Sequence, residues 1–185
     1  MENKQQILDL IKAYEIEFAD ERPRTEAIKT FMETFDGIDL FHRKNFVGHI
    51  TASAYILNPA KDSLLLLKHK ALKIWLQPGG HVDETDNSLY DAALREAEEE
   101  TGLSKRNLSR VNDLIFDVDS HAIPANDLKN EPPHVHHDIS FLFVCNKEEI
   151  NIDTDELTAS KWVSFAALEA DPNFEDFIRK IRSCI

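Results

Sequence analysis

Cysteine is scarce in this 185-residue sequence, which contains only Cys145 and Cys184. Neither belongs to a Cys-X-X-Cys pair or lies near histidines at the spacing of a zinc finger. Disulfide frameworks and structural zinc fingers need several cysteines at characteristic spacings, so the sequence predicts neither. We expect a protein of a reducing, cytoplasmic compartment.

Long apolar runs and an excess of basic charge are also missing. No stretch approaches the ~20 apolar residues of a membrane-spanning helix, and the N-terminus lacks the pattern of a signal peptide. The sequence contains 34 Asp and Glu against 21 Lys and Arg, which gives a formal net charge of -13. A nucleic-acid scaffold would need a basic face, so neither a membrane nor a nucleic acid is the expected partner. An acidic protein that handles phosphate usually needs metal ions to mediate the contact.

The spacing of apolar residues predicts a helical N-terminal segment followed by one domain. Ile7, Ile11 and Tyr14 recur at helical spacing, and a second helical pattern follows over 25–35, with Thr25 as its expected N-cap. We expect residues 1–45 to form a helical appendage and residues 46–185 to form the main domain. The hydrophobic content of 42% is sufficient for one substantial core.

The main domain alternates between strand and helix patterns. Strands are expected over 49–56, 63–68, 113–121, 137–145 and 161–164, and helices over 88–101, 165–170 and 174–181. Ser88 and Asp91 have the spacing of a capping box, and Gly102 supplies a stop signal for the central helix. This order predicts an α+β fold with a mixed sheet covered by helices.

The end of the helix predicted over 88–101 carries an unusual concentration of carboxylates. Glu96, Glu99 and Glu100 stand at i, i+3 and i+4, so they project from one helix face. At the negative end of the helix dipole each costs about 0.3 to 1 kcal/mol. A solvated acidic face is the usual explanation of a charge run, but this placement favours a site for Mg²⁺ or Mn²⁺, which take hard oxygen ligands. The neighbouring Arg95 is expected to orient and balance one carboxylate.

The same stretch resembles a known motif. Gly80, followed after a loop by residues 95–103 (Arg-Glu-Ala-Glu-Glu-Glu-Thr-Gly-Leu), is similar to the Nudix box. That pattern is Gly, five residues, Glu, seven residues and then Arg-Glu-U-x-Glu-Glu-x-Gly-U, where U is a bulky aliphatic residue. Ala97 is smaller than the pattern requires. Asp86 replaces the first Glu, and eight residues separate it from Arg95, which we interpret as a loop longer by one residue.

The resemblance to the Nudix family implies a fold, a reaction and a set of site residues. The fold is an α/β/α sandwich, and the reaction is attack of water on a phosphorus of a nucleoside diphosphate linked to another group. The substrate partner is therefore a small nucleotide-like molecule, although its identity is not specified by the sequence. The implied metal ligands are Gly80, through its carbonyl, Glu96, Glu99 and Glu100. The implied catalytic residues are Arg95, Glu96 and Glu156, the last as a further metal ligand or general base in a late loop.

Several basic residues are candidates for substrate binding or for a second site. Lys68 and Lys70 end a strand just before the box and could meet a distal phosphate, although basic residues also commonly end exposed strands. His81, inside the box loop, could touch the substrate. Together with His121, the pair His134 and His136 could form a second metal site or a phosphate contact, because an HxH pair on a strand shares one face. A polar loop leading into the next strand is the more common outcome.

Two other functions are compatible with a Nudix-like fold. A non-catalytic nucleotide-binding module is the main alternative, but the retained box carboxylates favour hydrolysis. An isomerase of isoprenyl diphosphates would need a catalytic cysteine, whereas Cys145 lies in an apolar run and Cys184 lies beside the last residue. The amphipathic N-terminal helices could also pack on a second subunit to form a homodimer.

Overall fold

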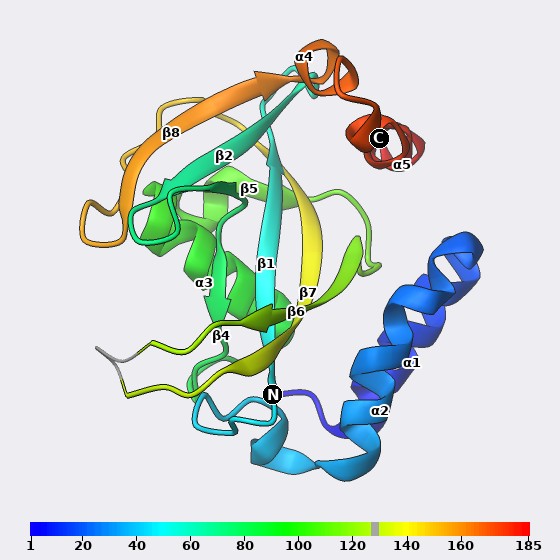
Figure 1. The fold of residues 1–185 in the computed structure, drawn as a ribbon. Helices are drawn as coiled ribbons and strands as arrows, with labels where there is room; N and C mark the ends of the chain where they lie inside the picture. Colours follow the sequence, from blue (N-terminus) through cyan, green and yellow to red (C-terminus); the bar gives the residue numbers. More distant parts are fainter. Residues whose placement is uncertain (127–129) are drawn as a thin grey trace. The chain divides into compact units, whose positions relative to one another are not determined.

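The computed structural model describes residues 1–126 and 130–185. The chain folds into two compact units, between which it passes several times (Figure 1). The first unit comprises Met1–Ser53, Gly80–Ala93 and Leu114–Phe141. The second comprises Ala54–Gly79, Leu94–Asp113 and Leu142–Ile185. Within the described ranges, no helix has both the length and the apolar character needed to cross a bilayer.

The first unit begins with the two predicted N-terminal helices and with two 3-10 helices that were not predicted. They are α1 (Lys4–Glu17), the 3-10 helix η1 (Ala19–Thr25), α2 (Glu26–Thr34) and the 3-10 helix η2 (Gly37–Leu40). The strands of this unit are β6 (Asp117–Ile123) and parts of β1 (His49–Leu57), β4 (Gly79–His81) and β7 (His134–Cys145). The central helix α3 (Leu89–Thr101) starts here and continues into the second unit.

The second unit contains the remaining strands and the C-terminal helices. Its strands are β2 (Ser63–His69), β3 (Trp75–Leu76), β5 (Leu108–Arg110) and β8 (Leu157–Ser164). Its helices, besides the end of α3, are η3 (Lys105–Asn107), α4 (Phe165–Glu169), η4 (Pro172–Phe174) and α5 (Glu175–Cys184).

The strands form a mixed sheet accompanied by helices, which confirms the predicted fold class. Among the described residues the order is β3-β2-β1-β7-β5, while β4 pairs with β1, β6 with β7 and β8 with β2. In the second unit the leucine run of β2 lies between its neighbours, with Leu64 opposite both Leu57 and Val163. Leu64, Leu65 and Leu67 are buried, so this run forms part of the core as expected for a strand paired on both sides.

Several strand boundaries differ from the prediction. β6 begins at Asp117 rather than at residue 113, although Ile115 and Phe116 are buried before it begins. Ile115 and Phe116 belong to the core but lie in an irregular segment. Their apolar character therefore indicated burial correctly but did not indicate a strand. β7 begins earlier than expected, at His134, and β8 begins at Leu157. The short strand β5 was not predicted, because three residues carry too little periodicity to be recognised.

Thr25 occupies the N-cap position of α2, as predicted, but its side chain makes no capping hydrogen bond. Its backbone already has helical torsion angles, φ −86° and ψ −9°, whereas a capping residue needs an extended backbone. Its hydroxyl instead donates to the carbonyl oxygen of Arg22, 2.9 Å away, and to the carboxylate of Glu15. The 3-10 helix η1 therefore leads directly into α2, a connection that the helical periodicity did not indicate.

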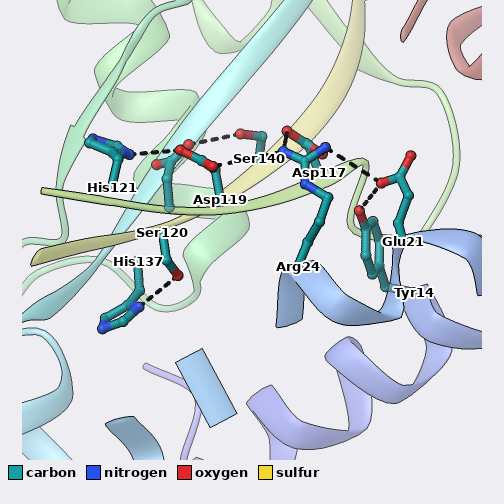
Figure 2. Close-up of polar contacts among 10 residues, drawn as sticks. Tyr14, Glu21, Arg24, Asp117, Asp119, Ser120, His121, His137 and Ser140 are labelled. Atoms are coloured by element: carbon teal, nitrogen blue, oxygen red, sulfur yellow. Dashed lines mark hydrogen bonds and ion pairs between the residues drawn. The ribbon is translucent and has the colours of Figure 1, made fainter. Parts of the chain in front are cut away.

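A polar network attaches η1 to β6 within the first unit, as Figure 2 shows. The guanidinium of Arg24 forms two parallel contacts with the carboxylate of Asp117, at 2.9 and 3.0 Å. Tyr14 donates its hydroxyl hydrogen to Glu21, and burial raises the pKa of Tyr14 above its ordinary value. Because Asp117 is buried, this paired, charge-assisted contact fixes the orientation of the N-terminal helices on the strand.

Candidate active site

The carboxylates predicted to bind metal lie on the part of α3 that belongs to the second unit. Arg95 Nη1 donates to Glu96 Oε1 at 2.9 Å and to Glu99 Oε2 at 3.1 Å. The sequence indicated that Arg95 would balance one carboxylate, and the structure shows it bridging two. The Glu96 side chain is only 15% exposed, whereas that of Glu99 is 57% exposed. Arg95 therefore holds a shielded and an open carboxylate on the same helix face.

Glu100 is tied to the glycine turn that precedes the box loop. The backbone N–H of Gly79 donates to Glu100 Oε2 at 3.0 Å. The carboxylate is therefore held against Gly79 and is not extended into bulk water. The next residue, Gly80, continues β4 in the first unit.

The surroundings of Glu100 disfavour its ionised form. Burial, together with the negative charges of Glu96, Glu156 and Asp153, raises the pKa of Glu100 to about 8, although the hydrogen bond from the N–H of Gly79 opposes the shift. A carboxylate placed here is therefore costly unless positive charge accompanies it. A hard divalent cation, which takes oxygen ligands, is the kind of partner that would offset this cost.

The loop that carries Glu156 packs against the end of α3. Asn151 donates its N–H to the Thr101 carbonyl at 2.9 Å, and Asp153 donates to the Glu100 carbonyl at 3.3 Å. These bonds satisfy helix carbonyls that have no partner within the helix. Gly102 permits the close approach, since its φ is +68° and a Cβ there would lie 3.1 Å from Asn151. Capping of the helix thus brings the acidic loop to the carboxylates.

The candidate substrate-binding lysines lie at the end of β2. Lys70 donates its backbone N–H to the Glu156 carbonyl at 2.8 Å, and its ammonium lies 3.4 Å from the Thr154 carbonyl. Lys70 and Glu156 are therefore neighbours. The side chain of Lys68 lies near Trp75 instead, with its Nζ 5.8 Å from the centre of the Trp75 ring. Lys161 Nζ lies closer to the same ring, at 4.0 Å, an interaction not expected from the sequence.

Asp86, which stands where the Nudix box has Glu, has a local structural role in the first unit. Its carboxylate accepts the N–H of Asp83 at 2.8 Å, and its own N–H donates to the Asp83 carbonyl at 3.0 Å. Asp86 is also 7% exposed. These reciprocal bonds close a tight turn.

The histidines form a cluster in the first unit. His134 and His136 lie within β7, so the expected polar loop before the strand is wrong. His49, His81 and His136 have ligand nitrogens within 4.8 Å of one another. His121 is paired with Asp119, 2.8 Å away, and this bond raises the pKa of His121. No motif in the sequence singled out His49, which was predicted only to be the first residue of a strand.

Comparison with known proteins identifies the family. The NUDIX domain model matches residues 48–182, so the chain belongs to the Nudix family. Over 103 residues the chain is 33% identical to the probable DHNTP pyrophosphohydrolase of Lactococcus lactis subsp. cremoris strain MG1363. That alignment covers 56% of this chain and 58% of the relative, less than two thirds of the relative's length.

Two solved structures share the fold. A NUDIX-family hydrolase from Clostridium perfringens is 25% identical, with a TM-score of 0.50, over 66% of this chain and 85% of that chain. The MutT protein of Methanosarcina mazei Go1 is 22% identical, with a TM-score of 0.51, over 74% of this chain and 94% of that chain. The likeness to the MutT protein concerns the fold alone.

Proposed function

We propose that this chain is a Mg²⁺-dependent Nudix hydrolase that cleaves a pyrophosphate linkage in a small nucleotide-like substrate. One observation carries the proposal: the shielded carboxyl of Glu100 is held at Gly79 among other acidic residues, a placement that a bound cation would make favourable. Membership of the Nudix family and the name of the Lactococcus relative support the same reaction.

We assign the proposed metal ligands to Glu99 and Glu100, with Glu96 as a ligand or general base and the Gly80 carbonyl as a further ligand. When bound, Mg²⁺ or Mn²⁺ neutralises the charge of the diphosphate and acidifies water for attack on phosphorus. These hard cations match an oxygen donor set such as the carboxylates of Glu99 and Glu100 would provide.

The remaining residues orient groups and move protons. Arg95 restrains Glu96 and Glu99, so both carboxylates keep a fixed direction before substrate arrives. Glu156, whose charge acts on Glu100, is the candidate to accept the proton of the attacking water if Glu96 serves as a ligand. We assign the contact with a distal phosphate to Lys70, whose backbone is bonded to that of Glu156.

The cysteines disfavour the isomerase alternative. Cys145 is buried, its Sγ lies 2.9 Å from the Lys147 carbonyl, and burial raises the pKa of the thiol. A catalytic cysteine would need an accessible thiol with an ordinary or lowered pKa. Cys184 ends α5, next to the last residue of the chain.

The reaction is tested by a Mg²⁺-dependent screen with product identification. The panel should contain the DHNTP named for the Lactococcus relative, nucleoside triphosphates, ADP-ribose, dinucleoside polyphosphates, nucleotide sugars and coenzymes. We expect phosphate or pyrophosphate release from at least one of them, abolished by EDTA. Nucleotide binding without turnover would instead indicate a non-catalytic module, and formation of an isomer would indicate the isomerase.

Mg²⁺ is expected to bind more tightly as the pH rises toward about 8. In the folded chain the pKa of Glu100 is about 8, above its ordinary value of 4.5. Protonation of Glu100 therefore stabilises the metal-free folded state. This contribution is complete below pH 4.5 and is lost as the pH rises through about 8. Because the cation binds the carboxylate, its apparent affinity should increase up to ~10-fold per pH unit below that value and then level off. Thermal unfolding at graded Mg²⁺ concentrations measures this trend, and a pH-independent affinity would contradict it.

The domain limits, compartment and oligomeric state follow as further proposals. We infer that residues 46–185 form the hydrolase domain, in keeping with a family match that starts at residue 48, and that residues 1–45 are an appendage.

Two free cysteines suit the cytoplasm. A homodimer formed through α1 and α2 is testable by sedimentation of the full chain and of a chain with substitutions on α1.

A further inference from the structure

Four imidazole rings gather at one place in the first unit. The ring centres of His49 and His136 are 4.6 Å apart, and His81 lies 5.0 Å from His49 and 5.2 Å from His136. His134 lies 5.1 Å from both His49 and His136. The rings come from β1, β4 and β7, which are separated in sequence, so the fold and not a local motif creates the cluster.

His49 has a buried nitrogen that needs an explanation. The residue is 0% exposed, and its Nδ1 lies 3.3 Å from the Asn45 carbonyl oxygen. A carbonyl can only accept, so Nδ1 carries the proton and Nε2 keeps a free lone pair. In the part of the chain that the structure describes, His49 Nε2 has no hydrogen-bond partner. A buried polar atom without a partner costs about 1 to 3 kcal/mol, which a bound ligand would offset.

His134 is held in the same tautomer. Its Nδ1 donates to the Pro132 carbonyl oxygen, 2.8 Å away, so the lone pair is on Nε2, where it accepts from His136 Nε2 in the metal-free chain and is available to coordinate a metal instead. Anchoring of one ring nitrogen by a backbone carbonyl is the usual support of a metal-binding histidine. His134 Nε2 lies 3.2 Å from His136 Nε2. With Zn–N bonds of ~2.0 Å, two ligand nitrogens on a tetrahedral zinc are separated by about 3.3 Å.

The charge state of the rings agrees with coordination. Burial and the neighbouring histidines lower the pKa of His81 to about 4 and the pKa of His136 to about 2. The His81 and His136 imidazoles are therefore neutral near neutral pH, and a neutral imidazole is the form that binds a metal. Imidazole nitrogen suits zinc and similar transition metals, whereas Mg²⁺ prefers oxygen.

We propose that His49, His81 and His136 form a binding site for a divalent transition metal, of which Zn²⁺ fits best, with His134 as the fourth ligand. The ion would link β1, β4 and β7 through side chains and would satisfy the buried nitrogen of His49. Modest ring rotations would bring nitrogens now up to 4.8 Å apart to coordination distance. The site uses none of the carboxylates proposed to bind Mg²⁺, so the two metals would select different ligand sets.

The test is metal binding by the full chain after removal of metals with a chelator. We expect one Zn²⁺ to bind, Co²⁺ to give the visible absorption of a tetrahedral site, and excess Mg²⁺ to displace neither. His136→Ala and the larger His136→Gln should weaken Zn²⁺ binding at least ~100-fold, more than loss of a supporting group would. Circular dichroism and unfolding of each variant establish that it is folded.

Two controls separate this site from other possibilities. His42→Ala removes an exposed histidine outside the cluster, and Glu100→Gln alters the proposed Mg²⁺ site, so both should bind Zn²⁺ as the unaltered chain does. Equal Zn²⁺ affinity in the His136 variants, or no binding by the unaltered chain, would overturn the proposal. Loss of Zn²⁺ binding in Glu100→Gln but not in His136→Gln would also overturn it, by assigning the zinc to the carboxylates. Because metal binding is measured directly, the outcome does not depend on hydrolase activity.

Discussion

Glu100→Gln is expected to reduce Mg²⁺-dependent turnover at least ~10³-fold, because the bound cation supplies several kcal/mol of transition-state stabilisation. The fold should remain intact. The glutamine Oε1 can still accept the N–H of Gly79, and the neutral amide removes a group whose ionised form is disfavoured by burial and by Glu96, Glu156 and Asp153. In the absence of metal, the free energy of unfolding at neutral pH should therefore be unchanged or higher.

The measurement combines kcat/KM at saturating Mg²⁺ with unfolding in urea. Glu98→Gln is the matched control, because it makes the same chemical change on the same helix outside the proposed ligand set. It should keep activity within about twofold, as expected for surface substitutions away from the site. Glu99→Gln should behave like Glu100→Gln in activity. Equal turnover in Glu100→Gln and the control would remove the metal assignment.

Asp138→Ala is expected to lower the free energy of unfolding by about 3 kcal/mol or more. Asp138 is buried and accepts hydroxyl hydrogen bonds from Thr51, Ser53 and Ser140, each at 2.8 Å. Burial raises its pKa, and these donors partly oppose the rise. Alanine would leave three buried hydroxyls without their acceptor and would open a small cavity.

Urea unfolding at constant pH measures this effect, and two comparisons interpret it. Asp138→Asn keeps the shape and one acceptor oxygen, so it should lose less stability than the alanine variant. Asp119→Ala removes a neighbouring carboxylate that is about half exposed and should change stability by less than about 1 kcal/mol. A loss below 1 kcal/mol in Asp138→Ala would show that the hydroxyls find other partners.

Features encoded by neighbouring residues were predictable. The central helix begins and ends as predicted, because Ser88 Oγ accepts the N–H of Asp91 at 3.0 Å and Gly102 has a positive φ. The carboxylate face followed from the spacing of Glu96, Glu99 and Glu100 alone. Each of these signals lies within one helical turn or at a helix end, where local geometry decides the outcome.

Features created by long-range contacts were not predictable. His49 contributes to the histidine cluster only because β1 lies near β4 and β7, and Asp153 acts on Glu100 only because its loop caps α3. Strand pairing and loop packing depend on the whole fold, so a single sequence carries no local signal for them. Thr25 makes no capping hydrogen bond for a related reason, since η1 gives it a helical backbone.

The most direct test of the proposed chemistry is hydrolysis in water enriched in oxygen-18, with and without Mg²⁺. If the carboxylates of α3 hold the cation for attack of water on phosphorus, each turnover should place one oxygen-18 atom on a product phosphate. Both cleavage and labelling should disappear in EDTA. Cleavage that persists in EDTA, or products that carry no label on phosphorus, would contradict the account.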